Sequence, residues 1–225
     1  MYTWLLFDAD GTLFDFDRAE AAALEHTFAD LNLGFASDTL ATYKELNEAL
    51  WKAFERGEVS QATIKTKRFA DLLAAVKLEA DVAAMSQHYT RHLANGQYLL
   101  EEALETVQAL AEKCRMMIIT NGLQEVQRPR FSSSVLMPYF QDLLVSGELG
   151  VAKPAPEIFD IAFERMGQPA KTEVLMIGDS LSSDIQGGVN YGIDTCWFNP
   201  SAKANPRALP IRHEISQLGE LLTIV

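Results

Sequence analysis

The chain has 225 residues, a length that fits one large domain or one domain with a sizeable insert. Its formal net charge of −12 argues against duplex nucleic acid and anionic membrane surfaces as partners, and no apolar run is long enough to span a membrane. Because the N-terminus lacks the features of a secretory signal, we expect a cytoplasmic protein whose two cysteines are buried free thiols.

The chain opens with an apolar strand that runs into an acidic turn. The run WLLF at 4–7 reads as a strand, and it continues directly into DADGT at 8–12. Alternate residues of a strand point to one side, so Asp8 and Asp10 are expected to project into one crevice if the extended geometry persists. A metal cation or a shared proton would offset their repulsion. Taken alone, the pair is better explained as a polar strand end with an Asx-type turn.

The segment that follows has a helical pattern and no strong strand. Apolar residues recur at helical spacing through 40–54, 64–76 and 82–93. The expected N-caps of these helices are Ser37, Ser60 and Asp81. We therefore predict a helical-bundle cap domain at 16–95, inserted into a catalytic core formed by 1–15 and 96–225.

Beyond this insert, short apolar strands alternate with helices. Strands are expected at 116–119, 143–145, 174–177 and 195–198, with helices between them and a last helix at 218–222. This alternation predicts an α/β fold with a doubly wound, Rossmann-like parallel sheet covered on both faces. In such folds, ligands bind beyond the carboxyl ends of the strands.

Polar side chains occur where that rule expects a ligand. They are Asp8, Asp10, Thr120, Asn121, Lys153, Asp179, Ser180 and Asp184. Each alone has an ordinary explanation as a turn, a solvated loop or a helix cap. Together they supply what phosphoryl transfer needs: a carboxylate nucleophile, an acid–base, donors and a positive charge for phosphate, and oxygen ligands for Mg²⁺.

These segments resemble the motifs of a known superfamily. The sequences DADGT at 8–12, TNG at 120–122, KP at 153–154 and GDSLSSD at 178–184 are similar, in order, to the four motifs of the haloacid-dehalogenase-like superfamily. The inserted helices resemble its helical type of cap. The second carboxylate, Asp10, is the mark of that superfamily's phosphatases, because its dehalogenases lack it and its transport ATPases carry threonine there.

A closer resemblance runs nearly end to end. The segments 7–10, 13–17, 150–154 and 195–199, together with Leu50, Trp51 and Gly57, are similar to those of bacterial pyrimidine 5′-nucleotidases. Pro129 departs from this pattern and argues against the helix that relatives have there.

The resemblance implies roles for the two acidic residues of the first motif and for the cofactor. Asp8 would be the nucleophile that forms an aspartyl-phosphate, and Asp10 would protonate the leaving alkoxide and then activate water. Asp179 would bind Mg²⁺ beside Asp8 and the main-chain carbonyl of Asp10, and Asp184 would contact the metal through water.

It also implies the phosphate contacts and the substrate. Thr120 and Lys153 would bind phosphate with help from Asn121, and Lys153 would also take part in catalysis. The expected partner is a small phosphorylated metabolite, a nucleoside 5′-monophosphate, with no nucleic acid polymer and no membrane. Since these groups address only phosphate and metal, we expect the inserted helices to select the leaving group.

The motifs are also compatible with other functions. A sugar-phosphate or phosphoglycolate-type phosphatase, or a phosphomutase of the same superfamily, would carry the same motifs, and a non-catalytic nucleotide-binding module is a further alternative. Within the insert, His88 and His92 have the spacing of metal ligands on a helix, but we interpret them as part of a solvated helix face. Trp51, Phe54 and Phe69 are interpreted as core residues, with stacking on a base as the alternative.

Overall fold

The computed structural model describes residues 1–225. The chain divides into two compact units. The first comprises Met1–Phe16, Tyr98–Gln124 and Phe131–Val225, and the second comprises Asp17–Gln97 with Glu125–Arg130. None of the helices combines the length and the apolar character that crossing a membrane requires.

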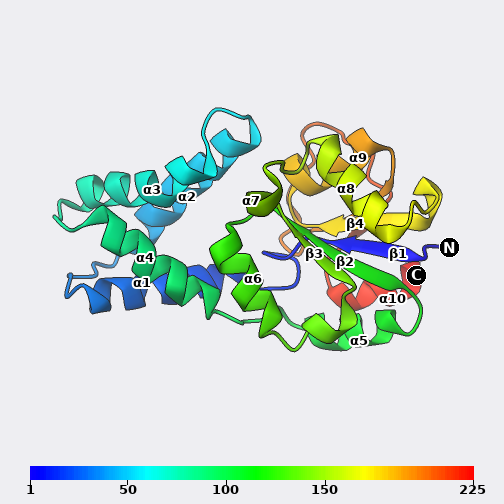
Figure 1. The fold of residues 1–225 in the computed structure, drawn as a ribbon, viewed down its shortest axis with the longest axis horizontal. Coiled ribbons are helices and arrows are strands. Elements are labelled where there is room, and N and C mark those ends of the chain that lie inside the picture. The colour runs from blue at the N-terminus through cyan, green and yellow to red at the C-terminus, as the bar shows by residue number, and fades with distance from the viewer. The chain divides into compact units, whose positions relative to one another are not determined.

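The first unit contains a six-stranded sheet in which every neighbouring pair is parallel (Figure 1). Its order is β3-β2-β1-β4-β5-β6. The strands are β1 Trp4–Phe7, β2 Arg115–Thr120, β3 Asp142–Val145, β4 Val174–Gly178, β5 Asp194–Phe198 and β6 His213–Ile215. The predicted doubly wound α/β class is confirmed. The sequence did not reveal β6, because this strand has only three residues and two of them are polar.

Side chains of the strands alternate between two apolar layers. Leu5 and Phe7 belong to the layer that includes α5 (Ala103–Ala111) and α10 (Leu221–Ile224). Trp4 and Leu6 belong to the layer on the other face, with α8 (Pro156–Met166) and part of α9 (Gln186–Tyr191) (Figure 1). Because both faces are covered, the central parts of β1 to β5 are apolar, and this explains their continuous hydrophobic runs.

One sequence expectation about helix α6 is wrong. This helix runs over Gln124–Ser132 and contains Pro129 within it. A proline removes one backbone hydrogen bond and crowds the carbonyl four residues earlier, but here only three residues of the helix follow it. The other short elements are α7 Ser146–Leu149, a π-helical turn Leu181–Ile185 and 3₁₀ turns at Met137–Tyr139, Lys171–Glu173 and Leu218–Glu220.

The second unit is built from α1 Phe16–Asp30, α2 Thr39–Glu55, α3 Gln61–Val76 and α4 Val82–Ala94, together with the Glu125–Arg130 part of α6 (Figure 1). Two predicted caps are confirmed: the Ser60 side chain accepts from the Thr63 amide, and Asp81 accepts from the Ala83 amide. The expected Ser37 cap is wrong. Helix α2 starts later, and Asp38 precedes it in a helical conformation without a side-chain cap bond.

The core of the helical unit combines aromatic rings with buried charges. Phe69 is fully buried and stacks on Tyr43, which confirms its interpretation as a core residue. The Arg68 guanidinium lies 4.9 Å from the centre of the Phe69 ring and donates to Asn47 Oδ1 at 3.3 Å. Asn47 in turn donates to Glu20 Oε1 at 2.8 Å. A polar chain thus links three helices inside an apolar core.

Candidate active site

The candidate site lies at the carboxyl ends of three adjacent strands. Asp8 follows β1, Asn121 follows β2 and Asp179 follows β4, and β1 lies between the other two in the sheet. The strand order reverses between β1 and β4, so this edge is the topological switch point at which doubly wound folds bind ligands. Thr120 is the buried last residue of β2, and Asp10 lies partly exposed two residues beyond Asp8.

Lys153 places a buried positive charge in this site. Its ammonium group donates to Asp8 Oδ1 at 2.6 Å and to the Ile119 carbonyl at 2.6 Å, and it lies 2.7 Å from Asp184 Oδ1. The side chain is only 1% exposed, although it comes from the loop between α7 and α8. An ammonium group has three protons, and these three partners account for all of them.

Asn121 holds the main chain of Lys153 in place. The Asn121 side-chain nitrogen donates to the Lys153 carbonyl at 2.7 Å, and the Lys153 amide donates back to Asn121 Oδ1 at 2.9 Å. The nitrogen and the oxygen of the Asn121 side-chain amide therefore both form hydrogen bonds with the main chain of Lys153. This geometry makes Asn121 a positioning residue for the lysine, whereas the sequence had suggested help in phosphate binding.

Two carboxylates contact this ammonium group, and the carboxylate of Asp179 lies beside them. Asp8, Asp179 and Asp184 each have an oxygen within 4.8 Å of the others. Burial raises the pKa of Asp8 well above its usual range and that of Asp179 to about 7, and the neighbouring Asp184 adds to both shifts. Burial alone would lower the pKa of Lys153, but the charges of Asp184 and Asp8 outweigh it and raise this pKa. The charges of Lys203 and Lys153 lower the pKa of Asp179, but they do not cancel the effect of its burial.

This donor set fits Mg²⁺. All the side-chain donors of the cluster are carboxylate oxygens, the ligands that a hard divalent cation prefers. The loop after β1 lies directly against them, since a Cβ added to Gly11 would sit 2.9 Å from Asp179 Oδ2. Gly11 also has a φ of +79°, which favours glycine. The side chain of Asp10 is not a member of the cluster, and the resemblance assigns only its main-chain carbonyl to the metal.

Three supporting contacts surround the site residues, and two of the residues that make them, Ser146 and Trp197, were not singled out from the sequence as parts of the site. The Trp197 indole donates to the Asp179 carbonyl at 2.9 Å, the Ser180 amide donates to Asp184 Oδ2 at 3.0 Å, and the Gly122 amide donates to the Ser146 hydroxyl at 3.2 Å. Ser146 directly follows β3, and Trp197 pairs with Gly178 across β4 and β5. Their positions near strand ends are the signal that would have found these two residues.

The sequence of the chain matches a family model described as haloacid dehalogenase-like hydrolase over residues 2–192. It is 41% identical to the HAD-hydrolase YfnB of Bacillus subtilis over all of this chain and 95% of that protein. It is also 33% identical to the pyrimidine 5′-nucleotidase YjjG of Escherichia coli and 34% identical to the pyrimidine 5′-nucleotidase PynA of Streptococcus pneumoniae. Each of these two matches covers 98% of this chain and 96% or 94% of the relative.

The fold has a solved counterpart. A crystal structure of Bacillus subtilis YfnB bound to magnesium superimposes with a TM-score of 0.94. The match covers 99% of this chain and 98% of that chain. The likeness therefore extends over both compact units and over every strand end described above.

Proposed function

The chain belongs to the haloacid dehalogenase-like hydrolase family and is a phosphatase, and we propose that it hydrolyses nucleoside 5′-monophosphates, pyrimidine nucleotides in particular, in a magnesium-dependent reaction. The observation that carries the proposal is the buried Lys153 ammonium held against Asp8, with Asp179 and Asp184 beside it. This arrangement combines a nucleophile, a fixed cation and a set of oxygen donors within one group of contacts.

The first half of the reaction is attack by Asp8. One carboxylate oxygen accepts from Lys153, which leaves the other free to attack phosphorus. A bond forms between this oxygen and phosphorus while the ester P–O bond breaks, and Asp10 gives its proton to the leaving nucleoside alkoxide. In the second half, Asp10 takes a proton from water as the water oxygen attacks phosphorus, which releases phosphate and restores Asp8.

Charge stabilisation comes from groups that are already in place. The ammonium group of Lys153 offers a positive charge to the phosphoryl oxygens. The Ile119 carbonyl accepts from this group and Asn121 holds the main chain of Lys153, so the charge is fixed before substrate binds. When bound, Mg²⁺ supplies further positive charge at the phosphoryl group. Asp8, Asp179 and the main-chain carbonyl of Asp10 are the groups proposed to hold it, with Asp184 acting through water.

The substrate class is supported by the two full-length nucleotidase relatives, whereas a sugar-phosphate phosphatase of the same family is the competing possibility. A panel of phosphomonoesters separates the two. We expect deoxyuridine, uridine or thymidine monophosphate to have a much higher kcat/KM than a hexose phosphate or phosphoglycolate. We also expect activity to vanish on chelation and return with Mg²⁺.

The panel needs a control for contaminating phosphatases. An Asp8→Asn preparation, purified in parallel, should be inactive toward every ester. If sugar phosphates are better substrates than all nucleotides, the nucleotidase proposal is wrong. Full activity after exhaustive chelation would contradict the metal assignment.

A further inference from the structure

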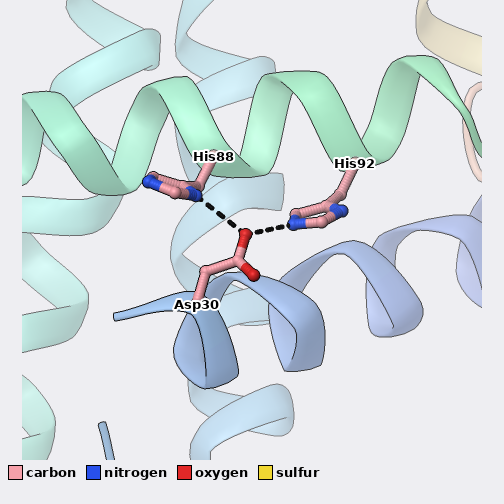
Figure 2. Close-up of side chains that lie close together, drawn as sticks. All are labelled: Asp30, His88 and His92. Carbon is pink, nitrogen blue, oxygen red and sulfur yellow. Dashed lines mark hydrogen bonds and ion pairs between the residues drawn. The ribbon is translucent and has the colours of Figure 1, made fainter. Parts of the chain in front are cut away.

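A second cluster of metal-binding side chains lies in the helical unit. Asp30 and His26 are one turn apart on α1, and His88 and His92 are one turn apart on α4. Figure 2 shows both imidazoles pointing from α4 toward the Asp30 carboxylate. His88 Nδ1 is 2.8 Å and His92 Nε2 is 2.7 Å from the same oxygen, Asp30 Oδ2. The cluster therefore brings two nitrogens and one oxygen to a single point.

We propose that Asp30, His88 and His92 form a binding site for a zinc-class transition-metal ion. Imidazole nitrogen together with carboxylate oxygen is a donor set that Zn²⁺ uses, and it differs from the all-oxygen set of the active site. The ligand atoms lie within 4.8 Å of one another. Zn²⁺ bonds of about 2.0–2.2 Å in a tetrahedron place ligand atoms about 3.3 Å apart, so each nitrogen would move away from the oxygen by about half an ångström.

The position of Asp30 favours a cation. Asp30 is the last residue of α1, where the helix dipole is negative, and the last turn of this helix holds no basic residue. A carboxylate there is unfavourable unless positive charge from elsewhere balances it. His88 and His92 bring no charge in their neutral forms, and these are the forms that bind metal.

Arg91 offers a competing explanation. Its guanidinium lies 2.7 Å from Asp30 Oδ2 and 3.0 Å from His88 Nδ1, so the cluster can also exist as an ion-pair network. The Arg91 side chain is 58% exposed, however, and an exposed ion pair stabilises a fold by little. A metal ion can therefore displace Arg91 at small cost. The Arg91→Gln variant separates the two explanations. It should bind the metal ion more tightly if Arg91 only competes for Asp30, and more weakly if the ion-pair network takes part in holding the ion.

A further imidazole is nearby. The His26 ring centre is 5.2 Å from that of His92, so three of the four histidines of the chain gather at this end of α1 and α4. The fourth metal position falls to His26 or to water. A His26→Gln variant separates these two possibilities, since it weakens binding only in the first.

The test titrates Zn²⁺ into the intact protein by calorimetry, with Mg²⁺ in large excess so that the active-site carboxylates do not compete. Co²⁺ serves as a second probe, because its visible spectrum reports nitrogen ligation and coordination number. We expect one Zn²⁺ per chain, and His88→Gln or His92→Gln should weaken binding by at least the ~10–100-fold seen for lost supporting contacts. The matched control is His213→Gln, which removes the one histidine outside the cluster and should leave binding unchanged.

The site is excluded if no Zn²⁺ binds in excess Mg²⁺, or if a His88→Gln/His92→Gln double variant binds it as tightly as the native chain. Circular dichroism of each variant checks that the helices persist. Weaker Zn²⁺ binding by Arg91→Gln would also contradict the proposal, because it would show that the ion-pair network of Arg91 contributes to binding the ion. None of these outcomes depends on phosphatase activity, so they are independent of the proposed function.

Discussion

The ammonium nitrogen of Lys153 lies 2.6 Å from Oδ1 of Asp8, although 145 positions separate the two residues in the chain. Both side chains are buried, and the lysine is anchored independently by Asn121 and Ile119. The contact therefore fixes the orientation of the carboxylate that we assign as nucleophile. It also brings a positive charge to the position where a phosphoryl group would be attacked.

Replacing Asp8 by asparagine should abolish turnover. The amide keeps the shape and can still accept from Lys153, but it lacks the anionic oxygen that attacks phosphorus. Phosphate release from deoxyuridine monophosphate is the measurement. Asp71→Asn, at a solvent-exposed ion pair of α3, is the matched control and should keep native activity. Substantial hydrolysis by a verified, uncontaminated Asp8→Asn preparation would refute the covalent mechanism.

Asp10→Asn should have an effect that depends on the leaving group. General acid–base catalysis is worth about 10²–10⁴-fold. Nucleoside alkoxides are poor leaving groups that need a proton, whereas an aryl phosphate expels a stable phenolate with little help. We therefore expect the variant to lose far more kcat on nucleotides than on p-nitrophenyl phosphate. Equal losses on both esters would argue against Asp10 as the acid.

Asn121→Ala should lower kcat while the protein stays folded. The substitution removes both hydrogen bonds that hold the main chain of Lys153, and a misplacement of about 1 Å in a catalytic group can cost about 10²-fold. Asn205→Ala is a matched control, because Asn205 makes the same reciprocal pair with the main chain of Leu209. If both variants lose the same activity, the effect is general and Asn121 does not position the lysine.

The sequence allowed the site residues at the strand ends to be predicted, because local hydrophobic patterns mark where each strand ends. Hydrophobic runs located β1, β2 and β4, and the carboxyl ends of parallel strands share one edge, so Asp8, Asn121 and Asp179 had to lie near each other.

Contacts between distant segments were not accessible in this way. The local hydrophobic pattern predicts neither the burial of Lys153 nor its hydrogen bonds with Asn121, which is 32 positions away. The same holds for His88 and His92. Their spacing was visible on one helix, but the carboxylate between them comes from α1, 58 positions before His88. The sequence of one helix therefore shows only an ordinary polar face, and a metal site shared by two helices becomes visible only once both helices are positioned in the structure.

The last prediction concerns Glu20, a buried acid in the core of the helical unit. Burial raises its pKa from 4.5 to about 7, although Lys44, the Asn47 amide and Arg68 oppose the shift, and Asp17 adds to it. Between these two values the unfolded chain releases a proton that the folded chain retains. The contribution of Glu20 to the free energy of unfolding is therefore greatest below about pH 4.5, and it falls as pH rises to about 7.

Glu20→Gln should remove this dependence. Glutamine keeps an oxygen that can accept from Asn47 but carries no charge, so the variant should gain stability relative to the native chain as pH rises from 5 to 8. Over this pH range, the free energy of unfolding of the variant should rise relative to that of the native chain by at most ~3 kcal/mol. Urea unfolding of the intact protein at several pH values, followed by circular dichroism, measures it. Glu25→Gln, at an exposed position of the same helix, is the control and should run parallel to the native chain. A Glu20→Gln curve that also runs parallel to the native one at all pH values would show that burial does not hold the proton on Glu20.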